Sequence, residues 1–274
     1  MKILNKAELR QAEKVLQSYL PRSFMVYGFL FGMNRNKPQT LEVVVDSWPD
    51  FKTIIFRPHQ KNEYALFLSK VVTFFSTDEK ILKRMLTEDN ILDWNQYFEM
   101  IGIDICHVTI LKGISVKSRQ WSVEHLLELK DPNLLPQLRV NSDLEPRISS
   151  LNESHISLVN KTWKYGGDEK SFQLVKLLIS HFPTCCITDE EGRPVSWVLL
   201  YDCYAMGMLY TAPEYRRRGY AKILISTMAT RLHSQGYPVY CYIQEENQLS
   251  YSLFKKLGFT EDPSYRAVCY EFNR

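Results

Sequence analysis

The alternation of hydrophobic and polar positions divides the first half of the chain into helix-like and strand-like stretches. In AELRQAEKVLQSYLP (residues 7–21) apolar residues recur at helical spacing and Pro21 ends the run. The runs SFMVYGFLF (23–31), LEVVVDSW (41–48) and KTIIFR (52–57) are rich in strand-forming residues and predict an antiparallel meander. DEKILKRMLTE (78–88) again has the pattern of an amphipathic helix.

A second series of elements follows the polar, proline-bearing segment 130–146, which predicts two domains, residues 1–145 and 146–274. The pattern predicts helices over 152–163 and 171–182, a hairpin over 184–202 and a strand over 204–211. A helix from Gly219 to Gly236, a strand over 238–243, a helix ending before Gly258 and a last strand over 266–272 complete the series. This order is that of an acyl-CoA-binding α/β fold, and the front half is a candidate for a degenerate copy of it.

Composition narrows the class of protein. The 274 residues include 45% hydrophobic and 24% charged residues, enough for a sizeable core. A net charge of +3, with basic residues interleaved with acidic ones, argues against nucleic acid as a partner. The six cysteines have no zinc-like spacing, so we expect reduced thiols and no metal site. No run of about 20 apolar residues predicts a membrane span, and the start lacks the apolar core of a secretory signal.

The segment PEYRRRGYAK (213–222) concentrates positive charge between a predicted strand and a predicted helix. The first N–H groups of a helix lack partners and the helix end is positive, so such a turn suits a phosphate or pyrophosphate. Gly219 allows the backbone to approach the anion, and Arg216, Arg217 and Arg218 add charge around it. The plainer interpretation is a solvated basic helix start with an ordinary glycine.

The later segment EENQLSYSLFKKLGF (245–259) follows the next predicted strand. Together the two segments resemble the signatures of the GNAT superfamily of acyl-CoA N-acyltransferases, Q/R-x-x-G-x-G/A and N-x-x-A-x-x-L-Y-x-x-x-G-F. The resemblance implies a GNAT-type α/β (α+β) fold, with a mixed central sheet flanked by helices, and acyl-CoA as co-substrate. It assigns the contacts with CoA to three groups of residues: Leu209, Tyr210 and Thr211; Arg216, Arg217, Arg218, Gly219, Tyr220 and Ala221; and Asn247.

A closer resemblance spans nearly the whole chain. VVDSWPDF (44–51), VNKTWKYGGDEKS (159–171), FPTCCITDEEGRPVSW (182–197) and TAPEYRRRGY (211–220) are similar to the glycine N-acyltransferase and glycine N-acyltransferase-like family. This resemblance implies transfer of an acyl group from acyl-CoA to the amine of glycine or a similar small amino acid. It also implies a family-specific N-terminal α/β domain.

Two departures from the family pattern concern the proton transfers. The tyrosine that often serves the departing thiolate in GNAT enzymes is replaced by Phe254, and Tyr251 is the nearest substitute. The glutamate base of the glycine-conjugating relatives is replaced by Ala205. Asp202 is three positions away, so alternation along a strand places it on the opposite face. Glu245 and Glu246 are the acidic residues nearest in sequence to Asn247, and Glu246 with Tyr251 are the candidate catalytic residues.

Other functions remain open at this point. One is a CoA-binding protein with weak or lost catalysis, and another is an N-acetyltransferase of a peptide or polyamine amine. The family resemblance implies a mitochondrial location, with cytoplasm as the alternative, because the N-terminus carries acidic residues and lacks a clear Arg/Ser-rich presequence. We expect a monomer with no permanently bound cofactor.

Overall fold

The computed structural model describes residues 1–59, 70–88, 91–115, 117–137 and 142–274. The chain forms two compact units, each assembled from separated segments. The N-terminal unit contains Met1–Leu126, Ile243–Glu246 and Asp262–Arg274, and the C-terminal unit contains Leu127–Tyr242 and Asn247–Glu261. The domain boundary at residue 145 stays a prediction, because units defined by contacts in space need not correspond to a single division of the sequence.

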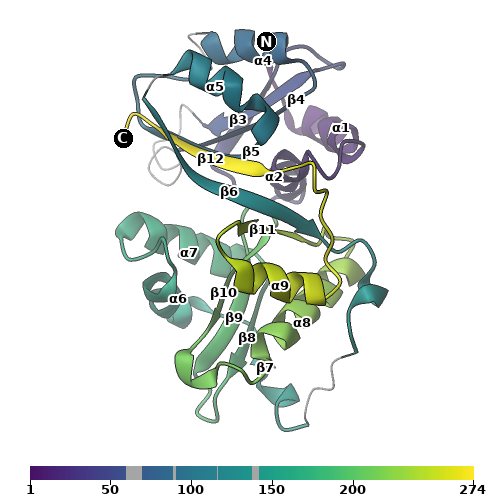
Figure 1. Cartoon of the computed structure of the whole chain (residues 1–274), viewed down its shortest axis with the longest axis vertical. Helices are drawn as coiled ribbons and strands as arrows, with labels where there is room; N and C mark the ends of the chain where they lie inside the picture. The colour runs from purple at the N-terminus through teal and green to yellow at the C-terminus, as the bar shows by residue number, and fades with distance from the viewer. Residues whose placement is uncertain (60–69, 89–90, 116, 138–141) are drawn as a thin grey trace. The chain divides into compact units, whose positions relative to one another are not determined.

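The N-terminal unit is built on a mixed sheet with the strand order β1-β2-β3-β4-β5-β12-β6 (Figure 1). Its strands are β1 (Lys2–Ile3), β2 (Leu41–Val45), β3 (Thr53–Pro58), β4 (Val71–Ser76), β5 (Phe98–Asp104), β12 (Ala267–Phe272) and β6 (Ser118–Glu128). β2, β3 and β4 pair antiparallel, which confirms the predicted strands over 41–48 and 52–57, whereas β4 and β5 pair parallel. β12 pairs antiparallel with both β5 and β6, and all of its residues are buried.

The helices of this unit are α1 (Lys6–Gln17), α2 (Phe24–Asn34), α4 (Glu79–Thr87) and α5 (Val108–Ile114). α1 and α4 are the two predicted amphipathic helices; Asn5 and Asp78 cap their N-termini through side-chain oxygens. The prediction of a strand over 23–31 is wrong, since these residues lie mostly in α2. Its residues Phe24–Gly32 are all buried. A helix that is covered all round shows no apolar stripe, so its sequence cannot be told from a buried strand by periodicity.

The C-terminal unit repeats part of this arrangement. Its strands are β7 (Ile148–Ser149), β8 (Thr184–Thr188), β9 (Pro194–Leu200), β10 (Met206–Thr211) and β11 (Tyr240–Gln244), in the order β11-β10-β9-β8-β7. Its helices are α6 (Ile156–Thr162), α7 (Glu169–His181), α8 (Tyr220–Ser234) and α9 (Gln248–Lys256), and α8 packs against β8 and β9 (Figure 1). In both units antiparallel strands lead into a parallel strand–helix–strand unit, β4–α4–β5 in one and β10–α8–β11 in the other.

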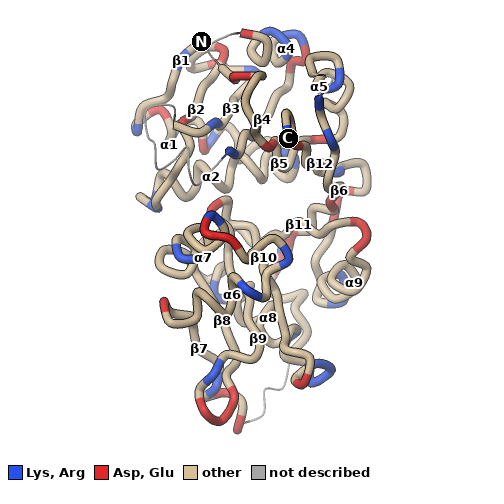
Figure 2. Tube along the Cα trace, turned by 90° about the vertical axis from the view of Figure 1, so that its left-hand side faces the viewer, with Lys and Arg blue, Asp and Glu red and all other residues tan. Residues whose placement is uncertain are grey.

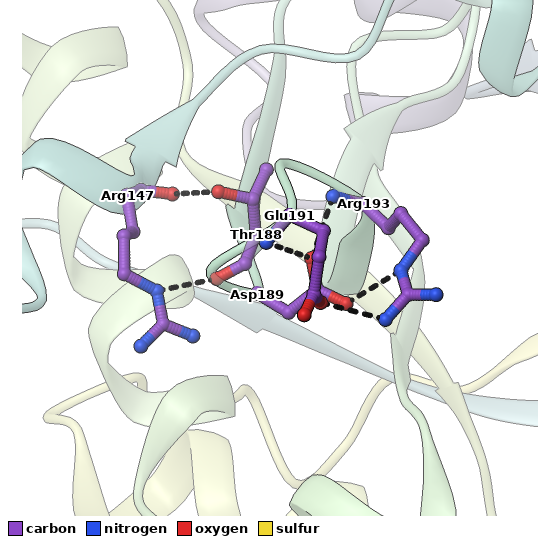
Figure 3. Close-up of polar contacts among 5 residues, drawn as sticks. All are labelled: Arg147, Thr188, Asp189, Glu191 and Arg193. Atoms are coloured by element: carbon purple, nitrogen blue, oxygen red, sulfur yellow. Dashed lines mark hydrogen bonds and ion pairs between the residues drawn. The ribbon is translucent and has the colours of Figure 1, made fainter.

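The hairpin between β8 and β9 turns at Asp189–Gly192, as predicted (Figure 3). The Asp189 carboxylate accepts the backbone N–H groups of Glu191 (3.1 Å) and Arg193 (2.8 Å) and pairs with the Arg193 guanidinium (2.8 Å). Gly192 supplies the positive φ of +81° that the turn requires. The same side chains that make this turn polar therefore also fix its conformation.

Charge is distributed without a dominant sign. Figure 2 shows basic and acidic residues scattered over each unit, in keeping with the interleaving in the sequence. Within the described residues, no helix is both long enough and apolar enough to cross a bilayer.

Candidate acyl-CoA site

Strand β10 is irregular at the residues expected to contact CoA. Its antiparallel register with β9 pairs Gly207 with Leu199 and Tyr210 with Trp197, so the two residues between them, Met208 and Leu209, oppose a single residue of β9. Met208 has a positive φ of +49°, as in a β-bulge. On its other side β10 pairs with β11 only at Met206 and Cys241, within the described part of the chain. The strands therefore separate beyond Met206, which leaves an edge against which an extended ligand can form hydrogen bonds.

The turn after β10 presents a helix end without a side-chain cap. A single 3₁₀ turn, Pro213–Tyr215, leads into the arginines, and Gly219 is the N-cap of α8 with φ of +82°. No side-chain hydrogen bond caps the first turn of α8. The N–H groups at the start of the helix, including those of Tyr220 and Ala221, therefore point at a position where an anion is stabilised by hydrogen bonds and by the helix dipole.

The three arginines differ in what holds them. Arg216 donates from Nε to the Thr211 carbonyl (3.1 Å), which ties the turn to the end of β10. Arg218 donates to the Glu214 carbonyl (3.0 Å) and lies over the Tyr215 ring at 4.9 Å. Arg217 has a positive φ of +65°, and its exposed side chain has no partner among the described residues. Arg217 is thus the arginine best placed to take a ligand phosphate without giving up another contact.

The second predicted segment begins at Asn247, the N-cap of α9. Its side-chain oxygen accepts the Ser250 N–H at 3.2 Å, which leaves the amide NH₂ group for a ligand. The Tyr251 hydroxyl donates to the Glu261 carboxylate. Glu245 and Glu246 are both exposed, but Glu245 forms an ion pair with Arg266 at 2.9 Å. The two acidic residues before Asn247 are therefore not equivalent, and Glu246 is the one with the more open carboxylate.

The region of the missing base does not have the geometry expected from strand alternation. β10 begins at Met206, and residues 201–205 form a turn closed by the Tyr204 N–H to the Tyr201 carbonyl (2.8 Å). The prediction that alternation places Asp202 opposite Ala205 is wrong, because neither residue lies in a regular strand. Ala205 is only 2% exposed. Burial raises the pKa of Asp202 to about 6, although the backbone N–H groups of Asp202 and Cys203 act against the shift.

A further carboxyl group with a perturbed pKa was not found from the sequence. Glu124 lies in β6, where the Ser122 hydroxyl donates to its carboxylate at 3.0 Å. Burial raises its pKa to about 7; the Ser122 hydrogen bond opposes the shift and the Glu246 carboxylate adds to it. Nothing distinguishes this glutamate in the run RQWSVEHLLEL (119–129) except its place in a strand with buried residues on both sides. A carboxyl group with a pKa near neutrality is suited to accepting a proton at physiological pH.

Comparison with solved structures agrees with this geometry. A Drosophila protein solved by structural genomics is similar to the chain with a TM-score of 0.80 at 16% identity, covering 99% of this chain and 97% of that one. A tandem GNAT protein from the clavulanic acid biosynthesis pathway has a TM-score of 0.56 at 11% identity, covering 98% and 96%. The fold and the β10–α8 turn define a GNAT-type acyltransferase fold, as predicted.

Sequence comparison identifies the family. The profile of the aralkyl acyl-CoA:amino acid N-acyltransferase family matches residues 1–183, and that of FR47-like proteins matches 186–268. Human glycine N-acyltransferase is 30% identical over 270 residues, covering 89% of this chain and 91% of the relative. Bovine glycine N-phenylacetyltransferase is 29% identical over 262 residues, covering 88% of each. The chain belongs to the aralkyl acyl-CoA:amino acid N-acyltransferase family, which confirms the predicted family and enzyme class.

Proposed function

We propose that this protein transfers an acyl group from acyl-CoA to the amine of glycine or a similar small amino acid, giving an N-acyl amino acid and CoA. The observation that carries the proposal is the β10–α8 turn. Among the described residues, no side chain caps the start of α8 at Gly219 and the Arg217 side chain has no partner. The glycine acceptor is supported by the names of the relatives, glycine N-acyltransferase and glycine N-phenylacetyltransferase.

Acyl-CoA binding follows from the backbone. The pyrophosphate accepts the N–H groups of Tyr220 and Ala221, with Arg217 and Arg218 neutralising its charge. The pantetheine arm pairs with the edge of β10 at Leu209, Tyr210 and Thr211, and the Asn247 amide holds a polar group of CoA. Gly219 leaves room for the pyrophosphate beside its Cα. Among the described residues, no atom lies within 4 Å of a Cβ added at this position, so a side chain would occupy the space that the ligand needs.

In the transfer step the neutral amine attacks the thioester carbonyl, a C–N bond forms and the C–S bond breaks. The nitrogen loses two protons, one from the ammonium before attack and one as the tetrahedral intermediate collapses. The CoA thiolate takes up one proton as it departs, and the other proton passes to solvent. Tyr251 is the proposed donor to the thiolate; its hydrogen bond to the Glu261 carboxylate breaks for this transfer, and the tyrosinate regains a proton from solvent. Glu246 is the proposed base, and Asp202 is the other candidate, because burial raises the pKa of Asp202 toward neutrality.

A screen tests the proposal directly. Purified protein is incubated with acetyl-, phenylacetyl- and longer acyl-CoAs against glycine and other small amino acids, and products are identified by mass spectrometry. We expect N-acylglycine with at least one acyl-CoA, and no product from the Gly219→Asp variant. Tight acyl-CoA binding without any acylated amine would instead support a CoA-binding protein that has lost catalysis.

Location and assembly are separate proposals. We propose that the protein acts in mitochondria and as a monomer, the first from its family and the second from the complete CoA-binding turn within one unit of one chain. A C-terminal fluorescent fusion imaged with a mitochondrial stain tests the location, and a uniform cytosolic signal would contradict it. Light scattering of the purified protein tests the assembly.

A further inference from the structure

The N-terminal unit contains a pocket of about 240 Å³ at the end of its parallel strand pair. Its walls come from the carboxyl ends of β4 and β5, from α2 and from the residues just before α2. The carboxyl ends of neighbouring parallel strands are a common place for ligands in α/β folds. The volume lies below the roughly 300–1,000 Å³ of pockets for drug-sized molecules, so a small ligand fits it best.

The pocket occupies the same position in its strand–helix–strand unit that the arginine turn occupies in the C-terminal unit, but its chemistry is different. The turn after β4 carries Asp78 and Glu79 where the other turn carries arginines. The Asp78 carboxylate already accepts the N–H groups of Lys80 (2.9 Å) and Ile81 (3.0 Å) at the start of α4. A phosphate at this turn would be repelled by Asp78 and Glu79, and the Asp78 carboxylate already accepts the N–H groups at the start of α4. This site therefore does not suit CoA.

The polar residues that line the pocket include Ser76 and Thr77 as well as the ionisable Arg22, Asp104 and His107. Arg22 and Asp104 form a loose ion pair with a nitrogen–oxygen distance of 3.4 Å, and the Arg22 side chain is 47% exposed. His107 is buried, and its Nδ1 atom has no hydrogen-bond partner within the described residues. Burial lowers the pKa of His107, so the ring is neutral and offers either a lone pair or an N–H at Nδ1.

Part of the remaining wall is apolar, and the Cys106 thiol in the lining is unreactive. Met25, Val26 and Phe74 are buried, and the Phe74 ring lies 5.6 Å from that of His107. Partial burial of its sulfur and the Asp104 carboxylate raise the pKa of Cys106 to about 12. A protonated thiol is a poor nucleophile. The site is therefore built to bind a molecule and carries no activated nucleophile.

We propose that this pocket binds a zwitterionic α-amino acid with an uncharged, apolar side chain. Its carboxylate pairs with Arg22, and its ammonium group pairs with Asp104. The apolar side chain lies against Met25, Val26 and Phe74. A ligand with one charge would leave either Arg22 or Asp104 without its partner, whereas a zwitterion inserts between them and pairs both. The site is separate from the acyl-transfer residues and does not depend on the proposed reaction.

The test uses the full chain labelled at its methionine methyl groups, with the Met25 signal assigned through Met25→Leu. L-phenylalanine is titrated without acyl-CoA, beside N-acetyl-L-phenylalanine and L-phenylalaninamide, which lack the ammonium and the carboxylate. We expect L-phenylalanine to shift the Met25 signal and each analogue to bind at least about tenfold more weakly, because each loses a charged hydrogen bond.

Two variants identify the pocket. Asp104→Asn keeps an oxygen that caps the Cys106 N–H, now 3.1 Å from Asp104. Arg22→Gln removes a half-exposed charge together with its ion pair to Asp104 and its hydrogen bond to Ser264. Both should weaken L-phenylalanine binding by about tenfold or more and leave acyl-CoA affinity unchanged. If L-phenylalanine leaves the Met25 signal unmoved, or binds both variants as well as the parent, the amino-acid site is disproved. Equal binding of the three probes would also overturn the zwitterion assignment.

Discussion

Glu124→Gln tests whether the fold holds a carboxyl group with a pKa near neutrality. Glu124 lies in β6 opposite Ala267 of β12, and burial is the main cause of its raised pKa. Ser122 is its hydrogen-bond donor, and in the described part of the chain no lysine, arginine or histidine forms an ion pair with it. Glutamine keeps the size of the side chain and its acceptor oxygen but cannot ionise.

The magnitude follows from the two pKa values. Glutamate has a pKa of 4.5 before the shift, and burial raises that of Glu124 to about 7. The folded state then holds its proton more tightly than the unfolded state. The contribution of Glu124 to stability is therefore highest below pH 4.5, falls as pH rises toward about 7, and is constant above it. The difference between the pKa values corresponds to an upper limit of about 3 kcal/mol.

Urea unfolding of parent and variant across this pH range measures the effect. We expect Glu124→Gln to match the parent under acid conditions and to exceed it at pH 8 by up to about 3 kcal/mol in the free energy of unfolding. Glu190→Gln, at an exposed turn position, is the matched control and should follow the parent throughout. Parallel pH profiles for the parent and Glu124→Gln would refute the reasoning.

The other predictions concern the acyl-transfer residues. Gly219→Asp should leave the fold intact, since aspartate tolerates a positive φ, and weaken acyl-CoA binding at least about tenfold by calorimetry; unchanged affinity would remove the phosphate-turn assignment. Arg217→Ala should weaken CoA binding by about tenfold to a hundredfold and flatten its salt dependence more than Arg216→Ala does, because Arg216 is engaged with Thr211; identical salt titrations would show that both arginines are merely solvated. Tyr251→Phe should lower kcat by about a hundredfold or more with little change in KM, and an unaffected kcat would exclude it as the thiolate's proton donor. Ala205→Glu should raise turnover with glycine at neutral pH and flatten the pH–rate profile, at a cost in thermal stability because the position is 2% exposed; an unchanged profile in a folded variant would show that position 205 does not face the amine.

The C-terminal unit was largely predictable because its signals are local. Each of its helices has a polar face, and the turns at Gly192 and Gly219 need the backbone freedom of glycine. The arginine turn was found because the phosphate-binding arrangement requires a strand, a glycine and a helix in immediate succession. These features lie within a few residues of one another, so a single sequence is enough to find them.

The failures arise where distant contacts decide the structure. α2 is buried on all sides, so its sequence is apolar throughout. It lacks the helical alternation of apolar and polar residues by which a helix is recognised. Asp202 was misplaced because a turn, closed by Tyr204 at φ of +64°, interrupts the strand assumed there. The perturbed pKa of Glu124 depends on burial in the fold and on Glu246, 122 positions away in the sequence, and no local pattern reports it.

The place of β12 has a consequence for synthesis on the ribosome. Between β5 and β6 lies a strand whose residues are translated after the whole of Leu127–Tyr242. While the ribosome makes that stretch, β5 and β6 lack their shared partner, and their unpaired edges and the apolar surface that Val268, Tyr270 and Phe272 later cover stay open. The nascent N-terminal unit is therefore expected to bind chaperones. A fragment that ends at Leu126 should aggregate unless a peptide containing residues 262–274 is supplied in trans.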